Sequence, residues 1–100
     1  MPVRLARMGD IPALQKLDPW PKEPIWRQKI AAGEVIVLEI DGDVAGLARY
    51  AVLWTTVPFL GLIEIAAEFR KQGHSRAMLT FLTAHLTQQG RRAALLVADR

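Results

Sequence analysis

The run Arg70-Lys71-Gln72-Gly73-His74-Ser75-Arg76 separates the apolar stretch Leu62-Ile63-Glu64-Ile65-Ala66 from a stretch with helical periodicity that starts near Met78. A turn of small residues at a helix start points several backbone N–H groups at one place, where the helix dipole adds partial positive charge. The cationic side chains of the run add whole charges. The run therefore predicts a phosphate-binding loop, although an ordinary strand-to-helix turn with solvated basic residues fits the same pattern.

The segments on either side of this run show strand and helix periodicities in a regular order. We expect an α/β fold with the element order β-α-α-β-β-β-α-β, in which helices cover both faces of a mixed central sheet. The expected strands are Val3–Arg7, Val35–Ile40, Val44–Trp54, Leu62–Ala66 and Ala93–Ala98; the expected helices are Asp10–Leu17, Ile25–Ala32 and Ser75–Gly90; and Thr55–Gly61 is expected as a loop.

The last strand–helix–strand unit places the Arg70–Arg76 run at a specific edge of this sheet. A right-handed crossover makes the strands Leu62–Ala66 and Ala93–Ala98 parallel. Ligands of such sheets bind beyond the carboxyl ends of the strands, and the run follows one of those ends. Upstream, Asp41-Gly42-Asp43 is typical of a hairpin turn between two antiparallel strands.

Length and composition limit the class of protein. The chain has 100 residues, which suits a single domain over 1–100 with no second core. Apolar residues make up 51% and charged residues 23%, as in packed globular domains. The absence of cysteine excludes disulfides, thiolate metal sites and a cysteine nucleophile. No apolar run has bilayer length and the first residues lack an export pattern, so we expect no membrane partner and a cytoplasmic location.

The charge pattern bears on possible partners. The formal net charge is +3 and the isoelectric point about 9.8, which favours a phosphorylated or acidic ligand. Basic residues are scattered through the first half of the chain and cluster only at Arg70–Arg76 and Arg91-Arg92. Because nucleic-acid-binding domains carry a denser basic stripe, we expect no nucleic-acid partner.

Four stretches of this sequence resemble the GNAT superfamily of N-acetyltransferases. Val3–Arg7 followed by Asp10–Leu14 is similar to the opening strand and helix of that family, and Glu39–Gly46 to its central hairpin. Ile63–Ser75 is similar to its acetyl-CoA signature, and the final helix and strand follow in the expected order. In the signature, Arg70, Gly73 and Ser75 occupy the places of Gln or Arg, Gly, and Gly or Ala, so Ser75 departs from the pattern.

The resemblance implies acetyl-CoA as the acyl donor and a site for it. The pantetheine arm is expected in a V-shaped gap between the strands Leu62–Ala66 and Ala93–Ala98, where it pairs with backbone groups of Ile63 and Ile65. The pyrophosphate is expected on the backbone N–H groups from Lys71 to Arg76. The implied cofactor-binding residues are Ile63, Ile65, Arg70, Lys71, Gln72, Gly73, His74, Ser75 and Arg76.

Members of this family usually continue for a further helix and strand pair, a segment that commonly provides a catalytic Tyr and one wall of the acceptor pocket. Here the sequence ends at Asp99-Arg100. Either a second subunit completes the sheet or the chain is a shortened form. Since Ala93–Ala98 is then an edge strand, a homodimer through that strand is expected.

Two residues are catalytic candidates. Glu64 is the carboxylate in the strand nearest the expected thioester, and its alternative role is to face solvent or to pair with a nearby arginine such as Arg49. Tyr50 is a candidate acid or acceptor-site residue, with packing in the sheet as its alternative. For Trp54 and Phe59 packing is favoured over a role in the acceptor pocket.

The two histidines complete the inventory of reactive side chains. His74 lies in the expected phosphate loop, where it touches cofactor or solvent, and His85 is expected to be structural. Two histidines without cysteines or a His-Glu-x-x-His spacing predict no metal site.

The first functional hypothesis is acetyl transfer to an amine of a small molecule or a protein. The second is a non-catalytic acyl-CoA-binding or protein-interaction module of the same fold.

Overall fold

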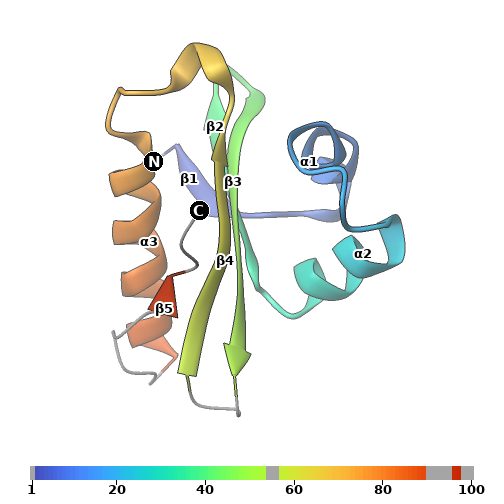
Figure 1. The fold of residues 1–100 in the computed structure, drawn as a ribbon, viewed down its shortest axis with the longest axis vertical. Coiled ribbons are helices and arrows are strands. Elements are labelled where there is room, and N and C mark those ends of the chain that lie inside the picture. Colours follow the sequence, from blue (N-terminus) through green and yellow to red (C-terminus); the bar gives the residue numbers. More distant parts are fainter. Residues whose placement is uncertain (1, 54–56, 90–95, 98–100) are drawn as a thin grey trace.

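The computed structural model describes residues 2–53, 57–89 and 96–97, which form a sheet with helices on both faces (Figure 1). The strands are β1 (Val3–Leu5), β2 (Val35–Ile40), β3 (Asp43–Leu53), β4 (Val57–Ile65) and β5 (Leu96–Val97). The α-helices are α1 (Ile11–Leu17), α2 (Glu23–Ala31) and α3 (His74–Gln88), and two 3-10 turns are η1 (Met8–Asp10) and η2 (Ala67–Phe69).

The described sheet has the strand order β1-β2-β3-β4-β5. The first three pairings are antiparallel, whereas β4 and β5 are parallel, with Phe59 opposite Leu96 and Leu60 opposite Val97. This confirms the expected α/β element order and the mixed sheet. It also confirms that the strands flanking α3 are parallel, as a strand–helix–strand crossover requires.

The sheet divides the core into two clusters. The cluster on the α3 side joins β2 and β3 to the helix, and the cluster on the α1 and α2 side lies on the opposite face (Figure 1). The buried members under α3 are Val3, Ile36, Leu38, Ala45, Ala48, Tyr50, Ile65, Met78, Leu82 and Leu86. The buried members under α1 and α2 are Ala6, Ile11, Leu14, Trp26, Val35, Val37 and Leu47.

The predicted loop Thr55–Gly61 is wrong over most of its length, because β4 already begins at Val57. Pro58 suggested a loop, since proline cannot donate a ladder hydrogen bond. Proline is nevertheless tolerated near the first residue of a strand. Pairing with the long β3, where Val52 lies opposite Pro58, extends the strand past the local signal.

Gly61 marks an irregularity in β4 rather than the end of a loop. Arg49 lies opposite Leu62, but the next residue of β3, Tyr50, lies opposite Leu60. Gly61 is therefore the extra residue of a β-bulge, a place where glycine is common. The described pairing of β4 with β5 reaches Leu60, immediately before this bulge.

Other boundaries shift by a few residues. β1 ends at Leu5 and not at Arg7, and α2 begins at Glu23 because Pro24 fits the first turn of a helix. The helix α3 begins at His74, with Gly73 as its N-cap. The remaining parts of three predicted elements, Trp54, Gly90 and all of Ala93–Ala98 except Leu96–Val97, lie outside the described residues.

Gly46 holds β3 against the end of β4. A Cβ added there would lie 2.8 Å from Ile65 Cδ1, 3.1 Å from the Glu64 carbonyl oxygen and 3.4 Å from Leu38 Cβ. The contact with Ile65 Cδ1, at the end of a side chain, is shorter than real Cβ atoms make, and the contact with the backbone carbonyl of Glu64 is tighter than nine in ten real Cβ contacts. Glycine at this position therefore allows the close approach that seats Ile65 under α3.

We expect Gly46→Ala to lower the free energy of unfolding by about 1 kcal/mol or more, as over-packing does. The matched control is Gly9→Ala, since a Cβ at Gly9 meets nothing within 4 Å. That substitution is expected to be neutral or slightly stabilising. Urea unfolding of both variants checks this, and an equal effect at the two glycines would show that the contact at Gly46 is unimportant.

A charged network ties β1, η1 and β2 together. Arg4 Nη1 and Nη2 donate to the two carboxylate oxygens of Asp10 at 2.9 and 3.0 Å, and Arg4 Nη2 also donates to Glu39 Oε1 at 2.7 Å. Asp10 also accepts a bond from the backbone N–H of Arg7 at 2.7 Å. The hydrogen bond from Arg4 is the main cause that holds the pKa of the Asp10 carboxyl below its ordinary value.

A depressed pKa makes this network a source of acid-sensitive stability. The contribution of Asp10 is complete above its ordinary pKa, near pH 4, and is lost as the pH falls through its lower value in the folded protein. We expect Asp10→Asn to lower the free energy of unfolding by about 2 kcal/mol at pH 7. The difference from wild type should shrink between about pH 5 and pH 2. The control is Asp43→Asn at an exposed position, which is expected to change the free energy of unfolding by less than about 0.5 kcal/mol at pH 7.

Candidate functional site

The connection from β4 to α3 has an unusual backbone. Lys71 and Gly73 both have positive φ, 62° and 82°, and Gly73 caps the helix. The first bond within the helix runs from the Ala77 N–H to the Gly73 carbonyl, at 3.2 Å. The N–H groups of His74, Ser75 and Arg76 therefore lack acceptors within the helix, and point out of its first turn. Since Ser75 makes no capping bond, the capping role belongs to Gly73.

This connection encloses a hollow of about 410 Å³ between the end of β4 and the start of α3. Its lining combines apolar walls with three cationic side chains, and none of the described residues that line it is a carboxylate. Its lining residues are Ile65, Phe69, Arg70, Lys71, Gly73, His74, Ser75 and Arg76. Cations, helix N–H groups and the positive end of the α3 dipole all favour an anion here.

Most of the predicted cofactor-binding residues therefore meet in one place. Seven of the nine predicted residues line the hollow, namely Ile65, Arg70, Lys71, Gly73, His74, Ser75 and Arg76. Gln72 is exposed and its side chain turns back to the Glu68 carbonyl, 3.2 Å away. Phe69 also lines the hollow, although it was not among the predicted residues, and its ring meets the His74 ring edge-on with 6.5 Å between centroids. Its position as the last apolar residue before the basic run could have indicated that it lines the site.

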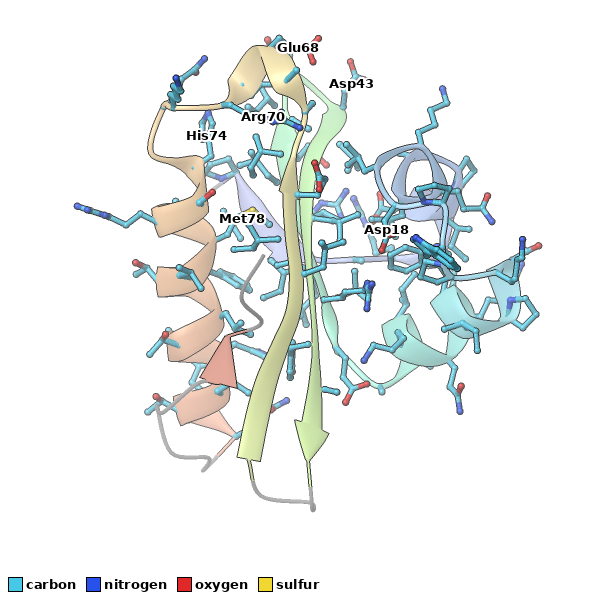
Figure 2. The ribbon with its side chains drawn as sticks, viewed as in Figure 1. Asp18, Asp43, Glu68, Arg70, His74 and Met78 are labelled. Atoms are coloured by element: carbon cyan, nitrogen blue, oxygen red, sulfur yellow. The ribbon has the colours of Figure 1, made fainter. Side chains whose placement is uncertain are left out.

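Arg70 joins the loop to the strand. Its Nε donates to the Ile65 carbonyl at 2.9 Å, and its Nη2 donates to Glu64 Oε1 at 3.0 Å. In Figure 2 Arg70 and His74 lie at the same end of the molecule, where β4 gives way to α3. The Arg70 side chain is 57% exposed and that of Glu64 is 23% exposed. The guanidinium therefore contacts β4 while facing the solvent of the hollow.

The backbone of β4 presents Ile63 and Ile65 to the sheet edge. The Ala66 N–H, directly after β4, donates to the carbonyl of Ala45 in β3 at 2.8 Å. Because backbone groups alternate in direction along a strand, those of Ile63 and Ile65 point away from β3, towards the β5 side. This orientation agrees with the predicted pairing of both residues with an extended ligand arm.

Glu64 lies on the face of the sheet opposite α3. It is directly across from Leu47, which belongs to the core under α1 and α2. It forms an ion pair with Arg70, so the expected pairing with a nearby arginine is made by Arg70 and not by Arg49, the arginine named as an example. Arg49 instead donates from Nε to Asp18 Oδ2 at 2.9 Å, and the Asp18 side chain is only 6% exposed. Figure 2 shows Asp18 between α1 and β3.

Tyr50 is 2% exposed and belongs to the core under α3. Its hydroxyl donates to the Gly33 carbonyl at 2.9 Å, and its backbone N–H donates to the Glu34 carbonyl at 3.0 Å. A buried hydroxyl with this backbone partner favours the packing interpretation over a catalytic one. Of the aromatic candidates for an acceptor pocket, Trp54 lies outside the described residues, and Phe59 is placed only as a β4 residue opposite Leu96.

His74 and His85 are placed apart on α3. His74 is its first residue and lines the hollow, whereas His85 stacks on Phe81 with ring centroids 6.3 Å apart. In the described ranges, no three His, Asp or Glu residues are grouped so that they could hold a metal ion. Among the same residues, no helix is both long and apolar enough to cross a membrane.

Comparison with known proteins relates this geometry to one family. Residues 5–99 match the model of the Acetyltransferase (GNAT) family. A search of curated proteins gave no match. Similar solved structures include N-acetylglutamate synthase from Neisseria gonorrhoeae, in complex with coenzyme A and N-acetyl-glutamate. It is 18% identical, with a TM-score of 0.78 over 89% of this chain and 23% of that protein.

Two further structures show the same fold. A Mycobacterium tuberculosis protein in complex with CoA is 22% identical, with a TM-score of 0.75 over 86% of this chain and 57% of its own. An N-acetyltransferase from Staphylococcus aureus is 20% identical, with a TM-score of 0.79 over 95% of this chain and 70% of its own. The chain thus spans 23% and 57% of the first two structures.

The bond from the Tyr50 hydroxyl to Gly33 gives a test of the packing role. We expect Tyr50→Phe to lower the free energy of unfolding by about 1–2 kcal/mol, because it leaves a carbonyl without its donor. Thr87→Val is the control, since it removes a hydroxyl-to-carbonyl bond that is exposed and should cost under about 0.5 kcal/mol. Equal unfolding free energies for Tyr50→Phe and wild type in urea titrations would contradict the packing role.

Proposed function

Because the chain belongs to the acetyltransferase (GNAT) family, we propose that it binds acetyl-CoA and transfers the acetyl group to an amine. The observation that carries the proposal is the cationic hollow at the start of α3. Its N–H groups and its three basic side chains suit a diphosphate, which in CoA carries two negative charges on adjacent phosphates. The family match and the CoA-bound neighbours support the same donor.

The chain offers a continuous path for the donor from this hollow. The N–H groups of His74, Ser75 and Arg76 face the diphosphate, with Lys71 and Arg70 beside it. The pantetheine arm then runs along the edge of β4, where the backbone groups of Ile63 and Ile65 point. This path ends near Gly61, where the described pairing between β4 and β5 begins.

Acetyl-CoA supplies a thioester. As the C–N bond to the amine forms, the C–S bond breaks and the sulfur leaves as the thiolate of CoA, which becomes the thiol by taking up the proton that the acylated nitrogen loses. Glu64 is the proposed base that takes the proton from the amine, because it is the carboxylate on β4 between the two edge residues Ile63 and Ile65. Its carboxylate lies on the face away from α3, opposite Leu47. The acceptor amine therefore approaches from the side of α1 and α2.

The structure favours no single amine as the acceptor, and the proposal covers small molecules and proteins alike. Pairing of two copies through the Ala93–Ala98 strand, and its role in completing the sheet, stays a prediction. A non-catalytic acyl-CoA-binding module remains the alternative function. One observation favours it, since the Glu64 carboxylate is already held by Arg70 at 3.0 Å.

Two substitutions at Gly73 test the donor site. A Cβ at Gly73 meets nothing within 4 Å, so a methyl group fits there, although the positive φ of 82° strains any side chain. Gly73→Ala carries that strain alone, and Gly73→Glu adds a negative charge at the proposed diphosphate site. By calorimetry we expect Gly73→Ala to bind acetyl-CoA nearly as wild type, and Gly73→Glu to bind at least about ten-fold more weakly.

The outcomes separate the two functions. Wild-type binding with release of CoA when amines are added supports acetyl transfer, whereas binding without turnover for a broad set of amines supports the acyl-CoA-binding module. If a folded wild-type protein does not bind acetyl-CoA, both are wrong. If Gly73→Ala weakens binding as much as Gly73→Glu, the loop acts through its backbone conformation and not through charge.

A further inference from the structure

Arg49 and Asp18 form an ion pair that the proposed function does not use. Arg49 Nε donates to Asp18 Oδ2 at 2.9 Å, and the pair joins β3 to the end of α1 (Figure 2). The Asp18 side chain is 6% exposed and that of Arg49 is 31% exposed. Apolar side chains of similar size often stabilise a fold as well as a buried ion pair does. The stability of the fold is therefore a weak explanation for this pair.

Asp18 fixes the direction of the Arg49 guanidinium. The Asp18 N–H donates to the Leu14 carbonyl at 2.9 Å, which anchors Asp18 to α1, and Asp18 Oδ1 accepts from the Trp20 N–H at 3.4 Å. Asp18 occupies only Nε of the guanidinium. Nη1 and Nη2 make no hydrogen bond to any of the residues that the structure describes. Since a guanidinium carries its N–H groups in a planar fork, the whole Nη edge of that fork is left for a ligand.

This Nη edge lies over the bulge of β4. Arg49 lies opposite Leu62, and a Cβ added at Gly61 would lie 3.5 Å from Arg49 Nη1. Cross-strand neighbours share a face of the sheet, and Leu62 packs against the core under α1 and α2. The guanidinium is therefore on the face from which the acceptor approaches in the proposed function. The donor path ends near Gly61, so an amine that attacks the thioester there has the guanidinium close to its nitrogen.

We propose that Arg49 binds a carboxylate of the acceptor, which makes the acceptor a small amine that carries a carboxylate, such as a free amino acid. The inference rests on the proposed function, since it names the acceptor class of the same acetyl transfer. A carboxylate accepts two parallel N–H bonds from one edge of a guanidinium. Arg49 thus determines specificity and takes no part in the bonds that form and break. A protein amine fits less well, because the main chain beside it carries amides and not carboxylates.

The test compares free amino acids with their α-amides as acceptors. The two members of each pair differ only at the carboxylate. The amide has the less basic amine, so a larger neutral fraction of the amine cannot explain a preference for the acid. Because the chain has no cysteine, a thiol reagent reports only the CoA that is released. For the wild type we expect kcat/KM of the best acid to exceed that of its amide at least about ten-fold.

Two sets of variants assign this preference to Arg49. Arg49→Gln alone would leave the buried Asp18 carboxylate without a cation, so it is combined with Asp18→Asn and compared with Asp18→Asn alone. Adding Arg49→Gln should lower kcat/KM at least about five-fold more for the acid than for the amide, whereas a merely structural role would lower both alike. Arg49→Lys keeps the cation but loses the fork, and it should reduce the preference about three-fold. It carries the test if the double variant does not fold.

The matched control is Arg27→Gln on α2. It removes the same charge from a side chain that is 58% exposed and pairs with Glu23 within its own helix. We expect it to change the preference for the acid by less than about 1.5-fold at physiological salt.

The outcomes separate this inference from the proposed function. The inference is overturned if the wild type acetylates amides as fast as acids, if the Arg49 variants lower both values alike, or if Arg27→Gln has the same effect as they do. Acetylation only of amines without a carboxylate contradicts the inference and leaves acetyl transfer standing. A folded wild type that binds no acetyl-CoA, or that acetylates no amine, contradicts acetyl transfer and this inference with it.

Discussion

The long antiparallel pairing of β3 with β4 is the constraint on which the rest of the structure depends. It runs from Gly46 opposite Ile65 to Leu53 opposite Val57, and it fixes where β4 ends. Gly46 permits the close approach that seats Ile65 beneath α3. Because the connection to α3 begins at that end, the register of this pair decides where the hollow and its N–H groups lie. A shift of the pairing by one residue would exchange the faces on which Glu64 and Ile65 lie, so that Glu64 would face α3 and Ile65 would face away from it.

The residues of the proposed site lie on both faces of the sheet. On one face, α3 brings helix N–H groups and basic side chains to a single hollow, a suitable place for a diphosphate. On the other face lie Glu64 and the buried Asp18–Arg49 pair, next to α1. Arg70 links the two, since it reaches from the hollow to the carboxylate.

The sequence was sufficient for the fold class, the element order and the loop residues, because strong periodicity and a short glycine motif are local signals. It failed at Thr55–Gly61, where pairing with β3 overrides the loop signal of Pro58 and Gly61. It could not assign ion pairs, since Asp18 and Arg49 are 31 residues apart and meet only through packing. For Glu64 the sequence suggested a nearby arginine such as Arg49, and only the folded loop shows that Arg70 forms the ion pair.

The proposed function depends on the first turn of α3 binding the diphosphate of the donor. Titration of the isotope-labelled protein with CoA, followed through its backbone amide resonances, tests this claim most directly. We expect the largest saturable chemical-shift changes at the backbone amides of Lys71–Arg76, accompanied by changes at Ile63 and Ile65. Shifts confined to α1 and α2, or none at saturating CoA, would contradict it.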